Sequence, residues 1–297
     1  VFMAWEHKSR RLEIGQNSFK MIDTHVHFWN YNKVKDAWIN DEMKILQRDF
    51  LPQHLRPELD QNGMEGIVAV QADQSENETK FLIELAKKNP EIKGIVGWVD
   101  LQNENIENKL LYYSQSSIIK GFRHIVQGES PGFLKGERFL KGINLLKDFG
   151  FTYDVLIYES QLEEAIEFVN KFTGQKFIID HCAKPAIKNK SINAWKNGMQ
   201  EISQNENVYC KLSGLTTEAN WNTWKEKDFY PYLDIVFDCF GTDRLLFGSD
   251  WPVVLVSGTY TKWKNLLKKY MHDFSEEEMR KVFTENAIEF YNLQRDN

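Results

Sequence analysis

Short apolar runs alternate with longer amphipathic segments along the chain from Met21 onward. Apolar runs bounded by polar residues are typical of strands in a buried parallel sheet, and amphipathic segments between them indicate helices. The pattern predicts eight strands, at residues 21–27, 66–71, 93–99, 119–124, 152–156, 177–180, 208–212 and 245–249. Such regular alternation favours a (β/α)8 barrel or a long doubly wound sheet.

Apolar residues recur at spacings of three and four in residues 77–88, 161–172 and 191–204, which predicts helices there. Ser275 and Glu278 have capping-box spacing, so a helix is expected to begin there and run towards Tyr291. No Gly-rich dinucleotide loop follows the first strand, which favours the barrel. The chain of 297 residues is close to the roughly 250 that a barrel needs. We therefore expect one α/β domain, a (β/α)8 TIM barrel over residues 21–297, with the polar residues 1–20 as an extension outside it.

Composition narrows the function classes. Hydrophobic residues make up 42% of the chain, enough for a sizeable core, and the net charge of -6 comes with scattered Lys and Arg residues, which disfavours nucleic-acid binding. Cys182, Cys210 and Cys239 are far apart, so we expect reduced thiols rather than disulfides or a structural zinc site. We found neither an apolar run of about 20 residues nor a signal-peptide pattern. We therefore expect a cytoplasmic protein without a membrane partner, and the oligomeric state stays open.

In barrel enzymes the catalytic residues lie at the carboxyl ends of the strands, and here those ends are polar. His25 and His27 end the first strand, where a period of two points both imidazoles to the same side. Two neutral imidazoles can bind one divalent cation or donate hydrogen bonds to a carbonyl oxygen. The alternative is a pair of core histidines held by buried partners.

Asp250 follows the last strand and is expected to enter the same end of the barrel, where a desolvated carboxylate suits a general base acting on water. Its alternative role is to cap the next helix. Arg123 and His181 end strands four and six, and Arg123 can bind a carboxylate or an oxyanion, or form a structural salt bridge. Lys184 fits a functional or a solvated position equally well.

Other polar and aromatic residues near these ends are less decisive. Alternation relative to His181 would turn Asp180 outward, and the direction of Asp154 beside Tyr153 stays open. Four tryptophans, Trp29, Trp98, Trp221 and Trp251, occur in the same loops. Flat side chains can stack on a sugar-like ring, although ordinary loop packing also explains each one, and together they favour a ring-shaped substrate.

Four motifs in this order resemble the amidohydrolase superfamily: Asp23-Thr-His-Val-His27, Gly121-Phe-Arg-His124, Asp180-His-Cys-Ala-Lys-Pro185 and Phe247-Gly-Ser-Asp-Trp-Pro252. The resemblance extends over residues 21–293 and is to its branch of lactone hydrolases, the L-fuconolactonase-like proteins and the 2-pyrone-4,6-dicarboxylate lactonases. Residues 71–79, 97–100, 211–214 and 217–221 also look like the sugar-lactonase group.

That resemblance implies hydrolysis of a cyclic ester, most simply a sugar (aldono)lactone such as an L-fucono- or L-rhamnono-lactone. It makes Asp250 the base, and His25, His27, His124 and His181 contacts to the carbonyl group or a metal. Arg123 would help to polarise the carbonyl. The expected substrate contacts are His124, Lys184, Gln71, Tyr153, Trp29, Trp98 and Trp251.

A metal is optional in this interpretation. One zinc-like divalent ion would be held by some of His25, His27, His181 and Asp250. Two-metal relatives carry a bridging Lys or Glu at strand four and a histidine at strand five, whereas this chain has Arg123-His124 and Tyr153-Asp154, which argues against a binuclear site. The alternatives are a mononuclear metal-dependent amidohydrolase or decarboxylase of the same superfamily, and a non-catalytic sugar-binding barrel.

Overall fold

The structure, a computed structural model, describes residues 19–295. Its eight parallel strands pair in chain order from β1 to β8. They are β1 (Met21–Val26), β2 (Met64–Val70), β3 (Ile92–Gly97), β4 (Ile119–Ile125), β5 (Thr152–Leu156), β6 (Phe177–Ile179), β7 (Val208–Leu212) and β8 (Leu245–Phe247). Every predicted strand is present, and the predicted (β/α)8 barrel is confirmed.

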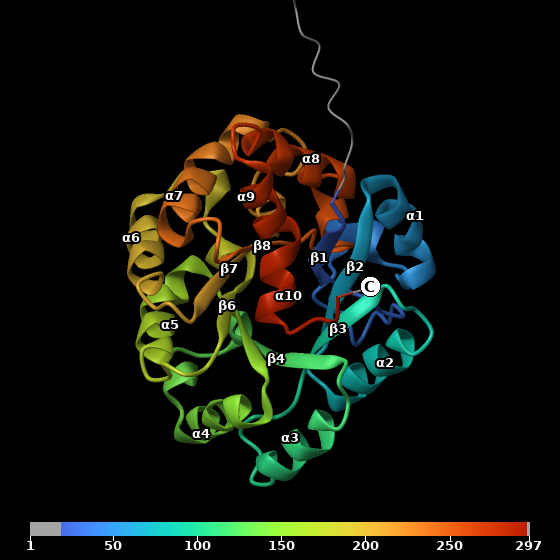
Figure 1. Cartoon of the computed structure of the whole chain (residues 1–297), viewed down its shortest axis with the longest axis vertical. Coiled ribbons are helices and arrows are strands. Elements are labelled where there is room, and N and C mark those ends of the chain that lie inside the picture. Colours follow the sequence, from blue (N-terminus) through green and yellow to red (C-terminus); the bar gives the residue numbers. More distant parts are fainter. Residues whose placement is uncertain (1–18, 296–297) are drawn as a thin grey trace, which may run out of the picture.

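Helices surround this ring of strands, and the last of them, α10, lies across its middle (Figure 1). They are α1 (Pro52–Asn62), α2 (Glu76–Ala86), α3 (Ile106–Ser114), α4 (Glu137–Leu146), α5 (Leu162–Val169), α6 (Asn193–Ile202), α7 (Tyr230–Phe240), α8 (Tyr260–Tyr270), α9 (Glu276–Arg280) and α10 (Asn286–Phe290). Ser275 caps α9 in the predicted capping box with Glu278. A π-helical turn, Lys281–Glu285, joins α9 to α10, so the helical segment does continue towards Tyr291.

The barrel closes between β1 and β8 through a few specific contacts rather than a full ladder. The Thr24 hydroxyl donates to the Phe247 carbonyl at 2.7 Å, and the Asp250 amide donates to the His25 carbonyl at 2.9 Å. The His27 amide in turn donates to the Trp251 carbonyl at 2.8 Å. These contacts bring the residues after β8 beside the end of β1.

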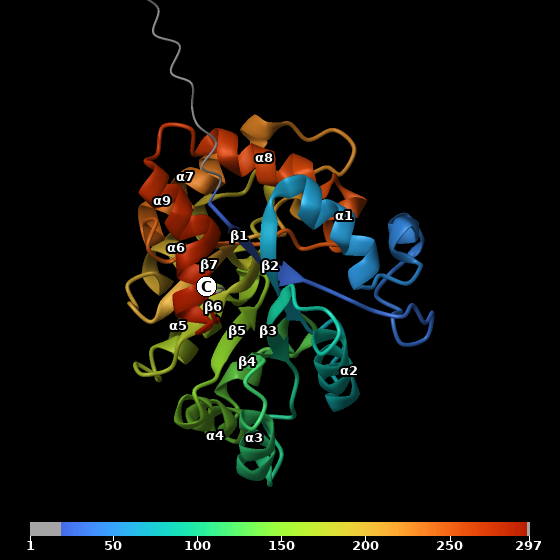
Figure 2. The ribbon, with the colours of Figure 1, turned by 45° about the vertical axis from the view of Figure 1, so that its right-hand side comes forward.

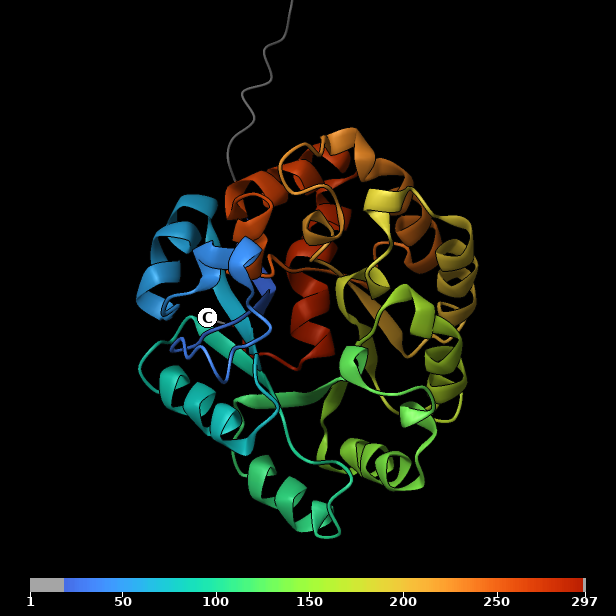
Figure 3. The same cartoon turned by 180° about the vertical axis from the view of Figure 1, so that it is seen from behind.

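One end of the barrel is sealed by apolar side chains. Ile22, Val68, Val96, Ile178 and Leu246 form a buried cluster with the end of the chain. From that end, Phe290 and Tyr291 pack into the cluster, and Figure 1 shows α10 lying across the middle of the ring. Seen from behind, the segments that follow the strands lie in front and α10 lies beyond them (Figure 3). The barrel interior is therefore closed at the amino-terminal end, and its carboxyl-terminal end is the open one.

The segment between β1 and α1 extends beyond the strands at the open end (Figure 2). It includes a 3₁₀ helix, η1 (Asp41–Leu46), which Asn40 caps by accepting hydrogen bonds from two backbone amides. The three cysteines are free, and Cys182 and Cys210 are buried. No helix within residues 19–295 is long and apolar enough to cross a membrane. The extension expected at residues 1–20 lies almost entirely outside the described residues.

Candidate active site

Asp250 owes its position to the junction between β1 and β8. It has a φ of 58°, in the left-handed region that a non-glycine residue seldom adopts. The backbone bonds to β1 hold it there, and the Ser249 hydroxyl accepts the next amide, that of Trp251, at 3.0 Å. The 3₁₀ turn that follows, η10 (Val253–Val256), has no side-chain cap. The carboxylate is therefore free of the capping role and points into the open end of the barrel.

His25 and His27 converge as their spacing predicted. Their Nε2 atoms lie 3.1 Å apart, and Asp250 Oδ1 is 3.4 Å from His27 Nε2 and 3.9 Å from His25 Nε2. His27 Nδ1 must donate to the Val70 carbonyl, 2.8 Å away, because a carbonyl oxygen only accepts. In neutral His27 the lone pair of Nε2 therefore faces His25 and Asp250.

His181 reaches the same place through an unusual backbone. After β6 the chain enters a 3₁₀ turn, η6 (Asp180–Ala183), in which His181 and Cys182 have φ values of 54° and 52°. Strand alternation places Asp180 inside the barrel with Ile178, and the left-handed turn then brings His181 inside as well. The alternation argument that would turn Asp180 outward is wrong, because the strand ends at Ile179.

His181 is fixed by the loop after β7. Its Nδ1 lies 2.8 Å from the Ser213 hydroxyl, and its ring centroid is 4.4 Å from that of His25. Gly214 has a φ of 63°, and a Cβ there would lie 2.5 Å from the His181 ring. Only glycine therefore fits both the backbone conformation and the close approach at this position.

A layer of buried charges lies directly beneath these groups, between them and the apolar seal. Lys211 forms ion pairs with Asp154 and, at 3.1 Å, with Asp180, and all three side chains are 0% exposed. Arg123 donates to Asp180 at 3.0 Å and to the Gln71 carbonyl, so the salt-bridge alternative for Arg123 is present. Tyr291 donates to both oxygens of Asp154 at 2.9 and 3.1 Å.

His25 joins this layer to the open end. Arg123 Nη1 is 3.2 Å from its Nε2, Lys211 Nζ is 3.2 Å from its Nδ1, and Asp180 Oδ1 is 3.5 Å from Nδ1. Sequence reasoning did not single out Lys211 as a site residue. The signal was nevertheless available, because a lysine between Cys210 and Leu212 in an apolar strand needs buried carboxylate partners.

Burial and neighbouring charges set the protonation states. Burial lowers the pKa of His25 well below its usual range, with Lys211 and His181 adding to the effect of burial, and it lowers the pKa of His181 to about 4. Burial disfavours the charged form of Asp250, but the neighbouring His181, His27 and His25 together outweigh burial and lower the pKa of Asp250. At neutral pH an ionised carboxylate therefore faces neutral His25 and His181.

Above these groups lies a cavity of about 620 Å³. His27, Arg123, His181, Lys184 and Asp250 line it. Its walls add residues from three loops that sequence reasoning did not bring to the site: Trp38, Asn40, Glu42 and Met43 before α1, Tyr158 after β5, and Thr217 and Glu218 after β7. Trp221, which was predicted among the loop aromatics, also lines the cavity.

Several expected substrate contacts do not line this cavity. Trp29 and Trp251 are buried beneath it, where both pack edge-on against Phe50. Tyr153 faces the helices and packs against Phe139 and Phe168, and the Gln71 amide donates to the Arg123 carbonyl at 3.2 Å.

His124 is also turned away from the cavity. Trp98 donates to its Nδ1 at 3.3 Å, Glu129 lies 2.8 Å from its Nε2, and Phe133 stacks on the ring. His124 points to the helix side because Arg123, its neighbour in β4, points into the barrel. The structure therefore groups Trp98 and His124 with each other rather than with Asp250.

The donor set at the open end fits one divalent cation. Ligand atoms of His25, His181 and Asp250 all lie within 4.8 Å of one another, and all three residues are buried. Nitrogens about 2.1 Å from one zinc ion lie roughly 3–3.5 Å apart, which matches the convergence of His25 Nε2 and His27 Nε2.

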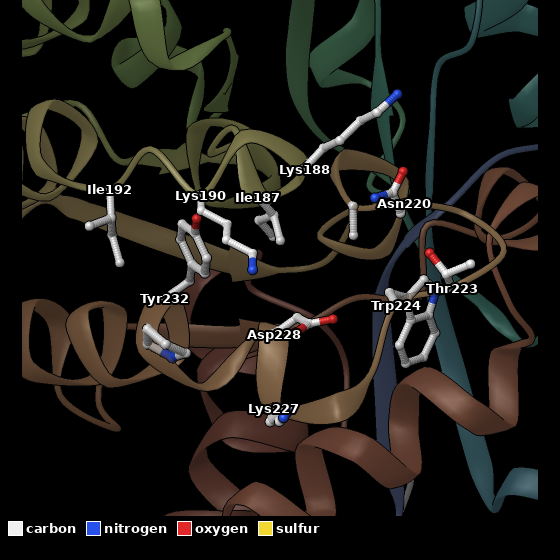
Figure 4. Close-up of a pocket in the computed structure, with 12 residues that line it drawn as sticks. Ile187, Lys188, Lys190, Ile192, Asn220, Thr223, Trp224, Lys227, Asp228 and Tyr232 are labelled. Carbon is white, nitrogen blue, oxygen red and sulfur yellow. The ribbon is translucent and has the colours of Figure 1, made fainter.

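A second cavity, of about 470 Å³, lies between the loops that follow β6 and β7 (Figure 4). Ile187, Lys190, Trp224, Asp228 and Tyr232 are among its lining residues. It includes none of the histidines or carboxylates described above. The cavity over Asp250 is therefore the candidate active site.

Comparisons with known proteins show which family the chain is similar to. A curated relative from Burkholderia multivorans, named L-fucono-1,5-lactonase, is 34% identical over 84% of this chain and 88% of its own length. Another L-fucono-1,5-lactonase, from Burkholderia ambifaria, is 30% identical over 92% of this chain and 96% of its own. A crystal structure of an amidohydrolase from Burkholderia multivorans with bound zinc superposes with a TM-score of 0.90 and 33% identity, over 93% of this chain and all of that one.

The sequence profile described as amidohydrolase matches residues 22–293, which include every strand of the barrel except the first residue of β1. That match covers the histidine pair of β1, the charged layer and Asp250. The resemblance noted from the four motifs is confirmed, and the chain belongs to the amidohydrolase family.

Proposed function

We propose that this protein is a lactonase that opens a sugar lactone, with Asp250 as the general base. The observation that carries the proposal is an ionised carboxylate set among His25, His27 and His181 at the floor of a cavity. Relatives at 34% and 30% identity, both named L-fucono-1,5-lactonase, support the same chemistry. The aromatic side chains of Trp38, Tyr158 and Trp221 in the cavity walls suit a sugar ring.

In the proposed reaction Asp250 accepts a proton from a water molecule as its oxygen bonds to the lactone carbonyl carbon. Arg123 lies at the cavity floor beside His25 and donates hydrogen bonds only, so it suits the oxygen that becomes negative in the tetrahedral intermediate. The bond between that carbon and the ring oxygen then breaks. Asp250 returns the proton to the departing oxygen, which leaves a hydroxy acid.

His181 acts in this scheme as a neutral group. Because burial keeps the pKa of His181 at about 4, its ring carries no charge at neutral pH and can donate to or accept from the substrate. Ser213 and the bare backbone at Gly214 hold the ring in place. The roles of His25 and His27 are to fix Asp250 and to contact the carbonyl oxygen.

A single divalent ion is compatible with the same residues. His25, His181 and Asp250 would hold it, with His27 beside them. Such an ion lowers the pKa of bound water and polarises a carbonyl group. Arg123 at 3.2 Å from His25 Nε2 already places a positive charge there, so an ester can be activated by fixed donors as well.

The test is a hydrolysis assay with L-fucono-1,5-lactone and L-rhamnono-γ-lactone, followed by the pH drop in a weakly buffered solution. Asp250→Asn keeps the shape of the side chain and should lower kcat by about 10²–10⁴-fold, because it removes the proton acceptor. Near wild-type turnover in that variant would refute the role of Asp250. Metal analysis of the purified protein and assay after chelation decide whether an ion takes part.

A further inference from the structure

The cavity is lined by both cationic and anionic side chains, and their pairing affects which lactones it can bind. Arg123 and Lys184 supply its cationic side chains among the described lining residues, and Glu42, Glu218 and Asp250 supply carboxylates. A lactone that carried its own carboxylate would need a cation not already satisfied by the protein. Binding of such a lactone therefore depends on whether Arg123 or Lys184 is free to pair with its carboxylate.

Both terminal nitrogens of Arg123 are already paired on the protein side. Its Nη1 donates to Asp180 at 3.0 Å, and its Nη2 donates to the Gln71 carbonyl. Asp180 is completely buried, so this pair is not weakened by solvent. Arg123 can still donate a hydrogen bond towards His25 and the reacting carbonyl group at the cavity floor.

Lys184 lines the cavity and forms an ion pair with Glu218. Its Nζ lies 3.6 Å from Glu218 Oε1, and the two side chains are 20% and 22% exposed. The backbone of Lys184 is set by the left-handed turn after β6, and its Nζ lies over the Tyr158 ring at 5.7 Å. Glu218 comes from the separate loop after β7, so two loops of the barrel supply one paired charge.

We propose that Glu218 determines substrate specificity by neutralising Lys184, so that the cavity accepts neutral, hydroxyl-bearing lactones and disfavours lactones that carry a carboxylate. This inference rests on the proposed lactonase function and narrows its substrate class. With the pair intact, Lys184 supplies hydrogen-bond donors and Glu218 supplies acceptors for sugar hydroxyl groups. With Glu218 removed, the same wall offers an uncompensated cation.

The same balance affects the product. Ring opening joins the water oxygen to the carbonyl carbon, breaks the ring ester bond and yields an acid that loses a proton. The product is therefore an aldonate anion even when the substrate is neutral. A wall without a free cation binds that anion weakly, which favours its release.

The experiment compares L-galactono-1,4-lactone with galactaro-1,4-lactone, which differ in a hydroxymethyl group or a carboxylate at C6. The measured quantity is the ratio of kcat/KM for the carboxylated lactone to that for the neutral one. Glu218→Gln should raise this ratio about fivefold, the upper end for a partly exposed ion pair. It should lower the inhibition constant of galactonate by a similar factor.

Two further variants test whether the Lys184–Glu218 pair causes the change in this ratio. Lys184→Met combined with Glu218→Gln removes the cation as well and should return the ratio to the wild-type value. Glu42→Gln removes a lining carboxylate that comes from η1 and forms no ion pair with Lys184 in the described part of the chain, and its ratio should stay well below that of Glu218→Gln. Equal ratios in the two single variants would overturn the proposal, as would an unchanged ratio in Glu218→Gln.

Failure of the proposed function gives a different result. A wild-type protein that opens no neutral lactone would refute the lactonase assignment. Calorimetric binding of galactonate and galactarate to wild type and Glu218→Gln needs no turnover, so it still tests whether Glu218 neutralises Lys184. Tighter binding of both anions to Glu218→Gln than to wild type supports the proposal, and equal binding refutes it.

Discussion

Replacing Lys211 by methionine should be far more destabilising than its single charge suggests. The ammonium group is the partner of Asp154 and Asp180 in a layer where all three side chains are 0% exposed. Removing one partner of a buried pair leaves an uncompensated charge and costs about 3–5 kcal/mol. Here one lysine serves two carboxylates, so we expect a loss at the upper end of that range. Equilibrium urea unfolding followed by tryptophan fluorescence measures it.

Lys264 provides a matched control. It is only 8% exposed, but its Nζ donates to the Asn62 carbonyl at 3.4 Å and forms no ion pair with a described residue. Lys264→Met should therefore cost about 0.5–1.5 kcal/mol. Equal losses in Lys211→Met and Lys264→Met would refute the importance of the charged layer.

Two further measurements examine the cause. Lys211→Met combined with Asp154→Asn should be more stable than Lys211→Met alone, because one unpaired carboxylate is gone. Burial already raises the pKa of Asp154 to about 6 against the opposing effect of Lys211. A carboxyl with a raised pKa binds its proton more tightly in the folded state, so stability falls as pH rises through that value. The deficit of Lys211→Met should therefore shrink between pH 8 and pH 5, and a deficit independent of pH would contradict this account.

Three other substitutions have defined outcomes. Tyr291→Phe removes the hydroxyl that donates to Asp154 and should cost about 1–2 kcal/mol in urea unfolding, whereas Tyr112→Phe on the exposed face of α3 should cost little. Gly214→Ala should lower kcat by displacing His181, whereas Gly258→Ala, with ordinary contacts no closer than 3.4 Å, should not; equal kcat values would contradict the close approach. Ser213→Ala should lower kcat/KM with little change in thermal stability, and an unaltered kcat/KM would show that His181 does not need this partner.

The barrel and its reacting groups could be predicted from sequence because they depend on local pattern. Each apolar run of four to seven residues became a strand. His25, His27, Arg123 and Asp250 lie at or just after the carboxyl ends of such runs, and the carboxyl ends of parallel strands meet at one end of a barrel. Position along the strand was sufficient to bring these residues together.

The remainder of the site depends on long-range packing. Asp180 and His181 both face inward because the backbone turns left-handed at His181, which no alternation rule anticipates. Trp29 and Trp251 were expected to meet substrate, but Phe50 from a distant loop packs against both of them. The wall formed by Trp38 belongs to a long irregular segment whose path is set by its tertiary contacts.

The contact between Tyr291 and Asp154 also has a consequence for synthesis of the protein. Asp154 leaves the ribosome with β5, its partner Lys211 comes with β7, and Tyr291 follows only after β8 and α9. Until that last turn is made, the base of the barrel is open and water reaches the carboxylate. We therefore expect nascent chains that stop before α10 to remain sensitive to proteases and to depend on chaperones, however many strands they already contain.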